Sequence, residues 1–427
     1  MTLRTRPIWK MFAPVVALLI LSCTSATPRP PAEGPATVAL RRLVSDHPDV
    51  GRLLAAAIAQ AKRINPDTLT NPAQSLEQYY AFVAWAERAI PGSLLKPKLN
   101  ATLYQRIDQS LGYLYFIADQ PLTDLEGQGY FNNSLQYTPR YGEWLRTFVR
   151  SWGAFLDSPS SWNPEYLRLA LADETFGLQH GWYEAPAQWH TFNDFFTRRL
   201  KNPGERPIAG PSDGSIVASP VDGVPQGLWT IGATSILTAP AGVPLKSGTV
   251  QAVDALLGSD SRFRSAFAGG TFTHSFLDVG DYHHYHFPLG GIVREVAIVP
   301  GQEVAGGFIT WDSIGRRYAF DPSSVGWQSL ETRGRLILDT EDYGLVALLP
   351  IGMSPVSSVT FEPGVQVGTR VAKGDLMGHF RFGGSDVVMV FQRGVTFRLD
   401  PPGDSTGRYA HLLMGQQLGR LSRMQRR

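Results

Sequence analysis

The first part of the chain has apolar positions at helical spacing. One stripe, with members at i, i+3, i+4, i+7, i+8 and i+11, consists of Val50, Leu53, Leu54, Ala57, Ile58 and Ala61. Pro48 lies near the start of this stripe, and Asn65-Pro66 follows its end. Because proline disfavours helical backbone at the residue before it, the pattern predicts a helix that stops at about residue 65.

A second helix is predicted from its own start signal. Ser75 and Gln78 have the spacing of a capping box, and the apolar pattern after them runs to Pro91-Gly92. Aromatic-rich stretches at 111–117 and 144–155 continue the helical pattern. Such stripes are first of all packing faces, so we expect an all-helical domain over 38–185 that carries no catalytic chemistry.

After about residue 204 the pattern changes to short β-branched and aromatic runs between glycine- and proline-rich turns. Runs at 336–338 and 346–349 are typical of buried strands. The segment 364–375 resembles the hairpins of barrel-sandwich folds, which include lipoyl carriers, and Lys373 is expected to be a turn residue in it. The fold class is therefore predicted as α+β, with a β-rich catalytic domain over 186–427.

Length and charge narrow the function classes. The 427 residues exceed what one small core requires and allow two or three domains. A net charge of +2 gives no indication of nucleic-acid binding, so no nucleic-acid partner is expected. Cys23 is the only cysteine of the sequence, which excludes an intramolecular disulfide.

The amino-terminal residues have the pattern of an export signal. Basic residues up to Lys10 precede an apolar run at 11–21, which is shorter than the roughly 20 residues of a comfortable membrane span. Cys23 follows Leu19-Ile20-Leu21-Ser22, which resembles a bacterial lipoprotein box. We predict a signal peptide at 1–22, lipidation at Cys23, a flexible tether at 23–37 and a location in the cell envelope, tethered to the membrane. An ordinary signal peptide or an uncleaved anchor are the alternatives.

The candidate chemistry begins at Gly383-Gly384-Ser385. A serine hydroxyl at this position can attack the preceding carbonyl and cut the chain, and Gly384 has no side chain to shield that carbon. The plain alternative is a glycine-rich turn between strands.

Three further motifs accompany this serine in a fixed order. They are Phe192-Asn193-Asp194-Phe195-Phe196-Thr197-Arg198-Arg199-Leu200, Ser219-Pro220-Val221-Asp222-Gly223, and Asp281-Tyr282-His283-His284-Tyr285-His286-Phe287-Pro288. Together the four motifs resemble the phosphatidylserine decarboxylase family, in the branch with an added amino-terminal helical domain.

The resemblance implies a self-cleaving proenzyme. Ser385 would attack Gly384 to form an ester, lose its Cα proton, and be hydrolysed to a pyruvoyl group, the covalent cofactor. A carbonyl that condenses with a substrate amine can accept the electrons left on Cα when carbon dioxide departs. The two cleavage fragments would stay associated, and a homodimer is a further expectation.

The resemblance also implies roles for the polar residues. His286 would be the general base for cleavage, Asp222 would orient it, and His283 would reprotonate the substrate Cα. Residues 283 and 286 point to opposite faces of a flat strand, so a bulge or turn is needed for both to reach one site.

Several other interpretations use the same residues. A serine hydrolase also needs Asp, His and Ser, although the second glycine of a nucleophile elbow is absent after Ser385. A zinc site could be built from His274, His283, His284 and His286. An inactive envelope binding lipoprotein is the third, because Asp386 replaces the Ser or Thr usual in the family. That carboxylate would either oppose the developing oxyanion or point into solvent.

The substrate expected first is phosphatidylserine, converted to phosphatidylethanolamine at a membrane surface. Arg198, Arg199 and Arg206 are candidate contacts for its phosphate. The alternative is a free aromatic L-amino acid such as tryptophan, since the branch with the helical domain includes decarboxylases of this kind.

Overall fold

The computed structural model describes residues 33–238, 252–302, 304, 306–323, 325–353, 358–383, 385–400 and 402–423. Cys23, Gly384, the predicted signal peptide at 1–22 and most of the predicted tether at 23–37 lie outside the described residues. Within the described part, a helical region over 35–196 precedes a β-rich region built from antiparallel sheets, as the α+β prediction requires.

The helical region contains seven α-helices among the described residues. They are α1 (Pro35–Asp46), α2 (Pro48–Ile64), α3 (Leu76–Ala86), α4 (Leu103–Phe116), α5 (Pro139–Leu156), α6 (Pro164–Ala172) and α7 (Phe192–Phe196). The predicted stripe is the inner face of α2, where Val50, Leu54, Ala57, Ile58 and Ala61 are buried. Proline at the first position of α2 fits because that residue's missing N–H would have no helical partner.

The start of α3 agrees with its cap signal, whereas its end does not. The Ser75 hydroxyl accepts a hydrogen bond from the Gln78 amide at 3.3 Å. The helix ends at Ala86, about five residues before the predicted stop at 91–92. After that point the amides of Arg88 and Ala89 bond carbonyls only three residues back, which tightens the chain into turns.

The largest sheet has eight antiparallel strands in the order β12-β6-β9-β10-β14-β4-β2-β3. Their bounds are β2 (Val224–Ile231), β3 (Leu237–Thr238), β4 (Thr271–Leu277), β6 (Gly291–Val299), β9 (Thr332–Asp339), β10 (Leu345–Gly352), β12 (Arg370–Val371) and β14 (Ser385–Phe391). The runs predicted at 336–338 and 346–349 lie in β9 and β10. Strand β14 lies between β10 and β4, so both of its edges are paired.

Three smaller sheets surround the large one. Their orders are β1-β16-β15, β11-β13-β5 and β7-β8. The strands are β1 (Ile216–Ala218), β5 (His284–His286), β7 (Phe308–Asp312), β8 (Arg317–Asp321), β11 (Val359–Phe361), β13 (Leu376–Phe380), β15 (Val395–Leu399) and β16 (Gln417–Arg423). A short α-helix, α8 (Val253–Leu257), and two 3-10 turns, Pro203–Glu205 and Trp327–Ser329, also lie in the described part of this region.

The segment 364–375 contributes β12 and the turn that leads into β13. Lys373 is a turn residue there, as expected. Its ammonium group donates hydrogen bonds to the carbonyls of Gly210, Asp213 and Ile216 at 2.6–2.7 Å. A lysine held by three carbonyls fastens one loop to another and is not presented to solvent as a carrier lysine would be.

Each face of β14 belongs to a different hydrophobic core. Val388 and Val390 pack in the core shared with the helices, whereas Val387 and Met389 pack in the core beneath the smaller sheets. This alternation follows from the two-residue period of a strand. Ser385 and Asp386, at the start of β14, therefore point to opposite faces of the sheet.

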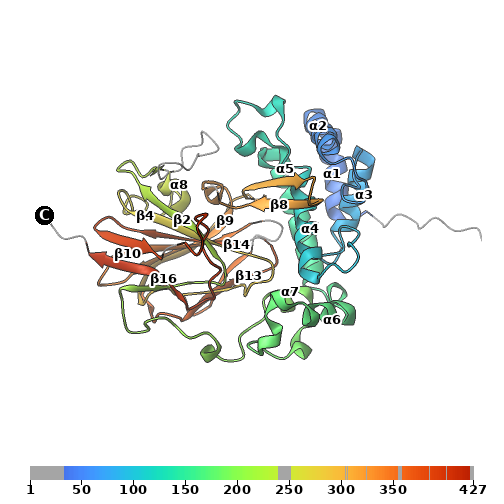
Figure 1. Ribbon diagram of the computed structural model, residues 1–427. Coiled ribbons are helices and arrows are strands. Elements are labelled where there is room, and N and C mark those ends of the chain that lie inside the picture. The colour runs from blue at the N-terminus through green and yellow to red at the C-terminus, as the bar shows by residue number, and fades with distance from the viewer. Residues whose placement is uncertain are drawn as a thin grey trace, which may run out of the picture. The chain divides into compact units, whose positions relative to one another are not determined.

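The β7–β8 hairpin connects the β-rich region with the helices, and it lies beside α4 (Figure 1). Gly112 of α4 touches this hairpin so closely that an added Cβ would lie 2.6 Å from Tyr318 Cβ. The Asn65 amide donates to the Tyr318 hydroxyl at 3.0 Å, and the Ile309 amide donates to buried Asp119 at 3.0 Å. In the described part of the chain, no helix combines the length and the apolar character that a membrane span requires.

Candidate active site

Ser385 is the first residue of β14 and is fully buried. It is paired with Gly352 of β10 and Leu277 of β4. Among the described residues its hydroxyl has no hydrogen-bond partner. A buried polar atom without a partner is unfavourable by about 1–3 kcal/mol, and here it leaves the hydroxyl free of competing hydrogen bonds.

The backbone before Ser385 uses a conformation reserved for glycine. Gly383 has φ +154°, which L side chains rarely adopt. The next residue, Gly384, lies outside the described residues, so the scissile bond itself has no described geometry. The positive φ at this position therefore accounts for one of the two glycines that precede Ser385.

Asp386 is neither exposed to solvent nor on the same face as the Ser385 hydroxyl. It is fully buried, and its carboxylate lies 3.0 Å from Nδ1 of His274 on β4, which is also fully buried. The interpretation in which this carboxylate points into solvent is therefore wrong, and its opposition to the developing oxyanion stays a prediction. The pairing joins two residues 112 positions apart, which no local pattern could indicate.

His286 is buried at the end of β5 and is held by two hydrogen bonds. Its Nδ1 donates to the Gly374 carbonyl at 2.8 Å, which leaves Nε2 with its lone pair in the neutral ring. Nε2 lies 3.2 Å from the Tyr282 hydroxyl, which donates to it. Burial lowers the pKa of His286, so the ring is neutral at pH 7 and Nε2 can accept a proton.

Asp222 does not form the hydrogen bond to His286 that the sequence-based roles imply. Its Oδ1 accepts from the Met414 amide at 2.7 Å, and its Oδ2 accepts from Arg206 Nη2 at 3.1 Å. Asp222 still acts on His286 through charge, because it opposes the lowering of the histidine's pKa by burial. The orientation of the His286 ring comes from Gly374 and Tyr282 instead.

His283 lies in different surroundings, just before β5. Its ring stacks on Phe196 with centroids 3.7 Å apart, and neither ring nitrogen has a partner among the described residues. Burial, followed by the charge of Arg198, lowers its pKa well below the usual range, so the ring is neutral. The strand opposite β5, β13, has a register shift between Leu376 and Gly378, but His283 and His286 lie in different surroundings, so their meeting in one site stays a prediction.

The segment 192–196 supports the strand end before Ser385. The Asn193 side chain accepts a hydrogen bond from the Phe382 amide at 3.1 Å and donates one to Asp157 at 2.8 Å. The Phe382 ring packs edge-on against Phe192 and Phe196. This opening motif therefore has a structural task, which is to position residues 382–383 directly before the cleavage position.

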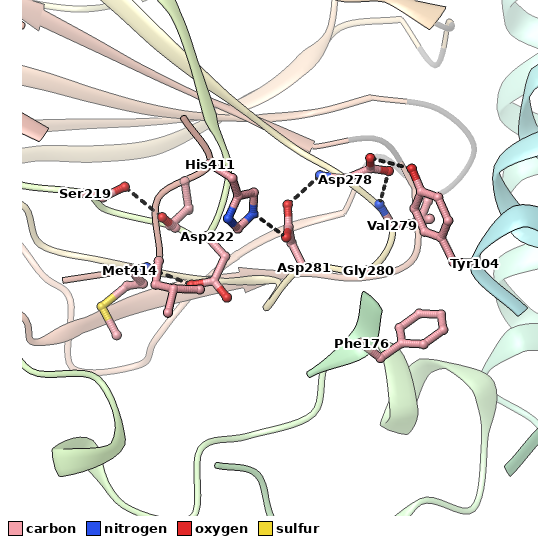
Figure 2. A network of polar contacts seen from close by, with 12 residues as sticks. Tyr104, Phe176, Ser219, Asp222, Asp278, Val279, Gly280, Asp281, His411 and Met414 are labelled. Carbon is pink, nitrogen blue, oxygen red and sulfur yellow. Dashed lines mark hydrogen bonds and ion pairs between the residues drawn. The ribbon is translucent and has the colours of Figure 1, made fainter. Parts of the chain in front are cut away.

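A hydrogen-bonded network of His411, Asp281, Asp278 and Tyr104 reaches the histidine motif (Figure 2), and of these residues only Asp281 belonged to a sequence motif. His411 Nε2 lies 2.7 Å from Asp281 Oδ1, and the other Asp281 oxygen accepts from the Asp278 amide at 2.7 Å. Asp278 in turn accepts from the Tyr104 hydroxyl at 2.7 Å, which reaches α4. The hydrogen bond to Asp281 raises the pKa of His411. The network ties the helical region to the loop that carries Tyr282 and His283.

A cavity of about 300 Å³ lies between α4 and the β-rich region, and we name it the aromatic cavity. It reaches Gly383 and Leu277, the strand partner of Ser385. Its other lining residues are Tyr104, Asp108, Leu111, Gly112, Tyr115, Phe276, Asp278, Val279, Ile309, Arg317, Tyr318, Ala319, Phe320 and Met353. Burial raises the pKa of Asp108 to about 6, so this carboxyl group titrates close to neutral pH.

A second cavity, of about 280 Å³, borders His286, and we name it the histidine cavity. Its lining includes Arg199, Arg206, Tyr282 and His284. Of the three arginines named as candidate phosphate contacts, two already have partners in the structure. Arg198 donates to the carbonyls of Gly280 and Asp281, and Arg206 pairs with Asp222. Arg199 remains exposed at the cavity.

The four histidines of the predicted zinc site are not gathered together. His274 pairs with Asp386, and His283 stacks on Phe196. His284 does lie near a carboxylate and another histidine, but these are Glu362 and His379, which the sequence analysis did not select.

The comparison with protein families decides between the remaining interpretations. The model of the family "phosphatidylserine decarboxylase" matches residues 192–420, which is more than half of the chain. The chain belongs to the phosphatidylserine decarboxylase family. It is therefore a carboxy-lyase, and the serine hydrolase and binding lipoprotein interpretations are not supported.

Relatives within this family differ in their length and their names. A phosphatidylserine decarboxylase proenzyme of Hahella chejuensis is 31% identical over 237 residues, covering 54% of this chain and 75% of the relative. Decarboxylase iboD of Amanita muscaria is 26% identical over 290 residues, covering 61% and 80%. Phosphatidylserine decarboxylase proenzyme 3 of Schizosaccharomyces pombe is 32% identical over 206 residues, covering 48% of this chain but only 19% of the relative.

Members of the phosphatidylserine decarboxylase family use a pyruvoyl group. The residues present fit its formation here, because Ser385 supplies a buried hydroxyl without a partner and Gly383 supplies the permissive backbone before it. His286 supplies a neutral imidazole, although the Ser385 hydroxyl is not hydrogen-bonded to it in this structure.

Proposed function

We propose that this protein is a pyruvoyl-dependent decarboxylase of a free amino acid with an aromatic side chain. The sequence alone favoured phosphatidylserine. The observation that favours an amino acid is the aromatic cavity, whose rings at Tyr115, Phe276, Tyr318 and Phe320 surround about 300 Å³. That volume is at the lower end of small-molecule sites and would not enclose two acyl chains.

The proposed self-cleavage uses this chain's own groups. His286 Nε2 takes the hydroxyl proton of Ser385, and Oγ attacks the Gly384 carbonyl carbon, so that an ester forms as the peptide C–N bond breaks. Removal of the Cα proton then expels Gly384 as a carboxylate and leaves dehydroalanine at 385. Water replaces the nitrogen, which departs as ammonia, and a pyruvoyl carbonyl remains.

A pyruvoyl group at position 385 would supply the electron sink for decarboxylation, because its carbonyl could condense with the substrate amine. His283, which burial keeps neutral, is proposed to donate its ring N–H proton to the substrate Cα while its other ring nitrogen takes a proton from water. The rings of the aromatic cavity would hold the side chain by offset and edge-on contacts. Asp108 would accept a hydrogen bond from a ring donor such as an indole N–H or a phenol O–H.

Cleavage before Ser385 should leave a folded two-fragment protein. The carboxy-terminal fragment would begin with β14, an inner strand paired on both sides, and would include β15 and β16, of which β16 pairs with β1. These ladders and both cores would hold the fragments together after the peptide bond is cut.

Intact-mass analysis of the purified protein tests the first half of the proposal. Cleavage should give a carboxy-terminal fragment of 427 − 385 + 1 = 43 residues with a blocked amino terminus. The Ser385→Ala variant should remain full-length. A wild-type chain that never splits would overturn the pyruvoyl mechanism.

Carbon dioxide release then tests the substrate. The cleaved protein should turn over tryptophan, tyrosine or phenylalanine in buffer. Turnover of phosphatidylserine in detergent micelles, without turnover of the free amino acids, would overturn the amino-acid proposal and leave the decarboxylase intact.

Phosphatidylserine stays the second candidate because of one surface feature. Leu99 and Ile314 are 93% and 96% exposed, and they lie on neighbouring loops. Lys98 joins these loops by donating to the carbonyls of Gly315 and Arg316. Two exposed apolar side chains next to basic residues are suited to contact an anionic lipid surface.

The amino-terminal pattern supports a separate proposal about where the protein is located. Lipidation at Cys23 would tether the catalytic region to a membrane of the cell envelope. Labelled fatty acid should enter the wild type and not the Cys23→Ser variant, which should be released or remain unprocessed. Labelling of neither protein would exclude lipidation.

A further inference from the structure

Strands β5 and β13 place two histidines directly opposite each other, outside the proposed catalytic roles. His284 and His379 are register partners in this antiparallel pair, and their ring centroids are 5.3 Å apart. Glu362 directly follows β11, which is the other neighbour of β13. A ring nitrogen of each histidine and a carboxylate oxygen of Glu362 all lie within 4.8 Å of one another.

The hydrogen bonds around these side chains leave ligand atoms free. His284 is almost fully buried, and its Nε2 donates to the Thr197 carbonyl at 2.9 Å. Its Nδ1 therefore carries a lone pair, and this buried atom has no partner among the described residues. A histidine whose second nitrogen is fixed by a backbone carbonyl is the usual arrangement of a metal ligand.

His379 and Glu362 are close to each other but do not form a hydrogen bond. His379 Nδ1 lies 3.7 Å from Glu362 Oε1, which is beyond hydrogen-bond distance. Their side chains are 19% and 25% exposed, so an ion could reach them from solvent. Ligand atoms around a tetrahedral zinc ion lie about 3.3 Å apart, given bonds of about 2.0–2.1 Å. Small side-chain rotations would therefore bring the three ligand atoms to the spacing of a zinc site.

We propose that His284, His379 and Glu362 form a binding site for one divalent transition-metal ion of the Zn²⁺ type. Two imidazoles and one carboxylate are ligands that zinc accepts, and three protein ligands leave a position for water. The ion would fasten β5 and β13 to the end of β11. Because His284 is two residues from His286, the site would stabilise the strand that carries the proposed base.

The charges around the site are mixed. Arg199 and Arg381 lie close to the two histidines, and their positive charges oppose the binding of a cation. Arg381 is itself paired with Asp157 at 2.7 Å, and the Glu362 carboxylate contributes the compensating negative charge. Glu362→Gln should therefore weaken binding even though it keeps an oxygen ligand.

Calorimetric titration of the chelator-treated, full-length protein with Zn²⁺ tests the site. The wild type should bind one ion per chain with saturation, and its melting temperature should rise with the metal. His379→Ala and Glu362→Gln should each bind at least tenfold more weakly and lose the thermal shift. Both side chains are partly exposed, so these variants should fold, which circular dichroism checks.

His190→Ala is the matched control, because it removes an exposed imidazole outside the cluster. Its zinc affinity should equal that of the wild type. Cobalt(II) should produce visible absorption bands of a low-coordinate site in the wild type and not in His379→Ala. Binding of equal strength in wild type and His379→Ala, or the absence of saturable binding in the wild type, would overturn the proposal. Neither result depends on whether the protein decarboxylates an amino acid.

Discussion

Asp386 and His274 form a fully buried pair, with 3.0 Å between the carboxylate and Nδ1, on the face of β14 opposite Ser385. The carboxylate accepts a hydrogen bond from the ring, so its loss would leave a buried donor unpaired. We expect Asp386→Thr to lower the free energy of unfolding by about 1–3 kcal/mol. Asp386→Asn, which keeps an acceptor oxygen, should cost less.

Denaturant unfolding of the uncleaved Ser385→Ala background measures this difference without interference from processing. If Asp386→Thr matched the unsubstituted background in stability, the pair would not hold β14 to β4. The family's usual Ser or Thr at this position would then be interchangeable with Asp386 in this fold.

Arg206 and Asp222 are a second buried pair, with only 2% and 4% of their side chains exposed. Asp222→Asn would leave the guanidinium without its counter-charge, and breaking a buried pair in this way costs about 3–5 kcal/mol. We therefore expect this variant to lose both stability and self-cleavage.

A double variant separates the two effects. Arg206→Met with Asp222→Leu removes both charges, so thermal unfolding should occur near the wild-type temperature. Self-cleavage, followed by gel electrophoresis, should still be slow because Asp222, whose effect on the His286 pKa is larger than the opposing effect of Arg206, is gone. Full cleavage in the double variant would show that Asp222 has only a structural task.

Self-cleavage should depend on pH through His286. Its neutral ring must accept the Ser385 proton, and burial lowers its pKa below the ordinary value of 6.5. Less than half of the protein therefore carries a protonated ring at pH 6.5. The rate constant of cleavage should fall as the ring becomes protonated, and it should reach half of its alkaline plateau only below pH 6.5.

Rapid dilution of denatured proenzyme into buffers of different pH, with cleavage followed by mass, checks this profile. The His286→Ala variant should cleave slowly and without that dependence. A midpoint above pH 6.5 in the wild type would argue that another group is the base.

The periodic and motif-bearing parts of this protein could be predicted from its sequence, whereas its pairings could not. The stripe of α2 and the runs in β9 and β10 are local patterns of apolar residues. Such patterns can be recognised from the spacing of residues along the sequence. Ser385, His286 and Asp222 were selected from ordered motifs. Their actual partners, Arg206 among them, depend on loops that come together only in the fold.

The same limit explains the residues that were missed. His411 meets Asp281 across 130 positions, and Asp108 reaches the aromatic cavity from a helix that was expected to carry packing residues alone. Asp108 could have been selected from the sequence, because it is a carboxylate on a helix whose core-facing side is otherwise apolar. No sequence signal of that kind marks His411.

The His411–Asp281 contact should stabilise the loop that carries Tyr282 and His283. His411→Ala removes the partner of a carboxylate whose pKa burial already raises. Since the pKa of His411 is raised in the fold, the contribution of this pair is complete below about pH 6.5 and is lost as pH rises through the folded pKa. The stability difference between wild type and variant should therefore shrink at alkaline pH. A difference that stays constant from pH 6 to pH 9 would contradict this account.

Asp108 should set the pH dependence of substrate binding if an aromatic amino acid occupies the aromatic cavity. Its pKa of about 6 means that the carboxylate, the stronger acceptor for a ring N–H, predominates above pH 6 and is lost below it. The KM for tryptophan should rise as pH falls through 6, while the KM for phenylalanine, which has no ring donor, should not follow this group. Asp108→Asn should raise the KM for tryptophan severalfold and remove its dependence on pH near 6. Steady-state carbon dioxide release with both substrates measures this, and equal pH profiles for the two amino acids would place the ring away from Asp108.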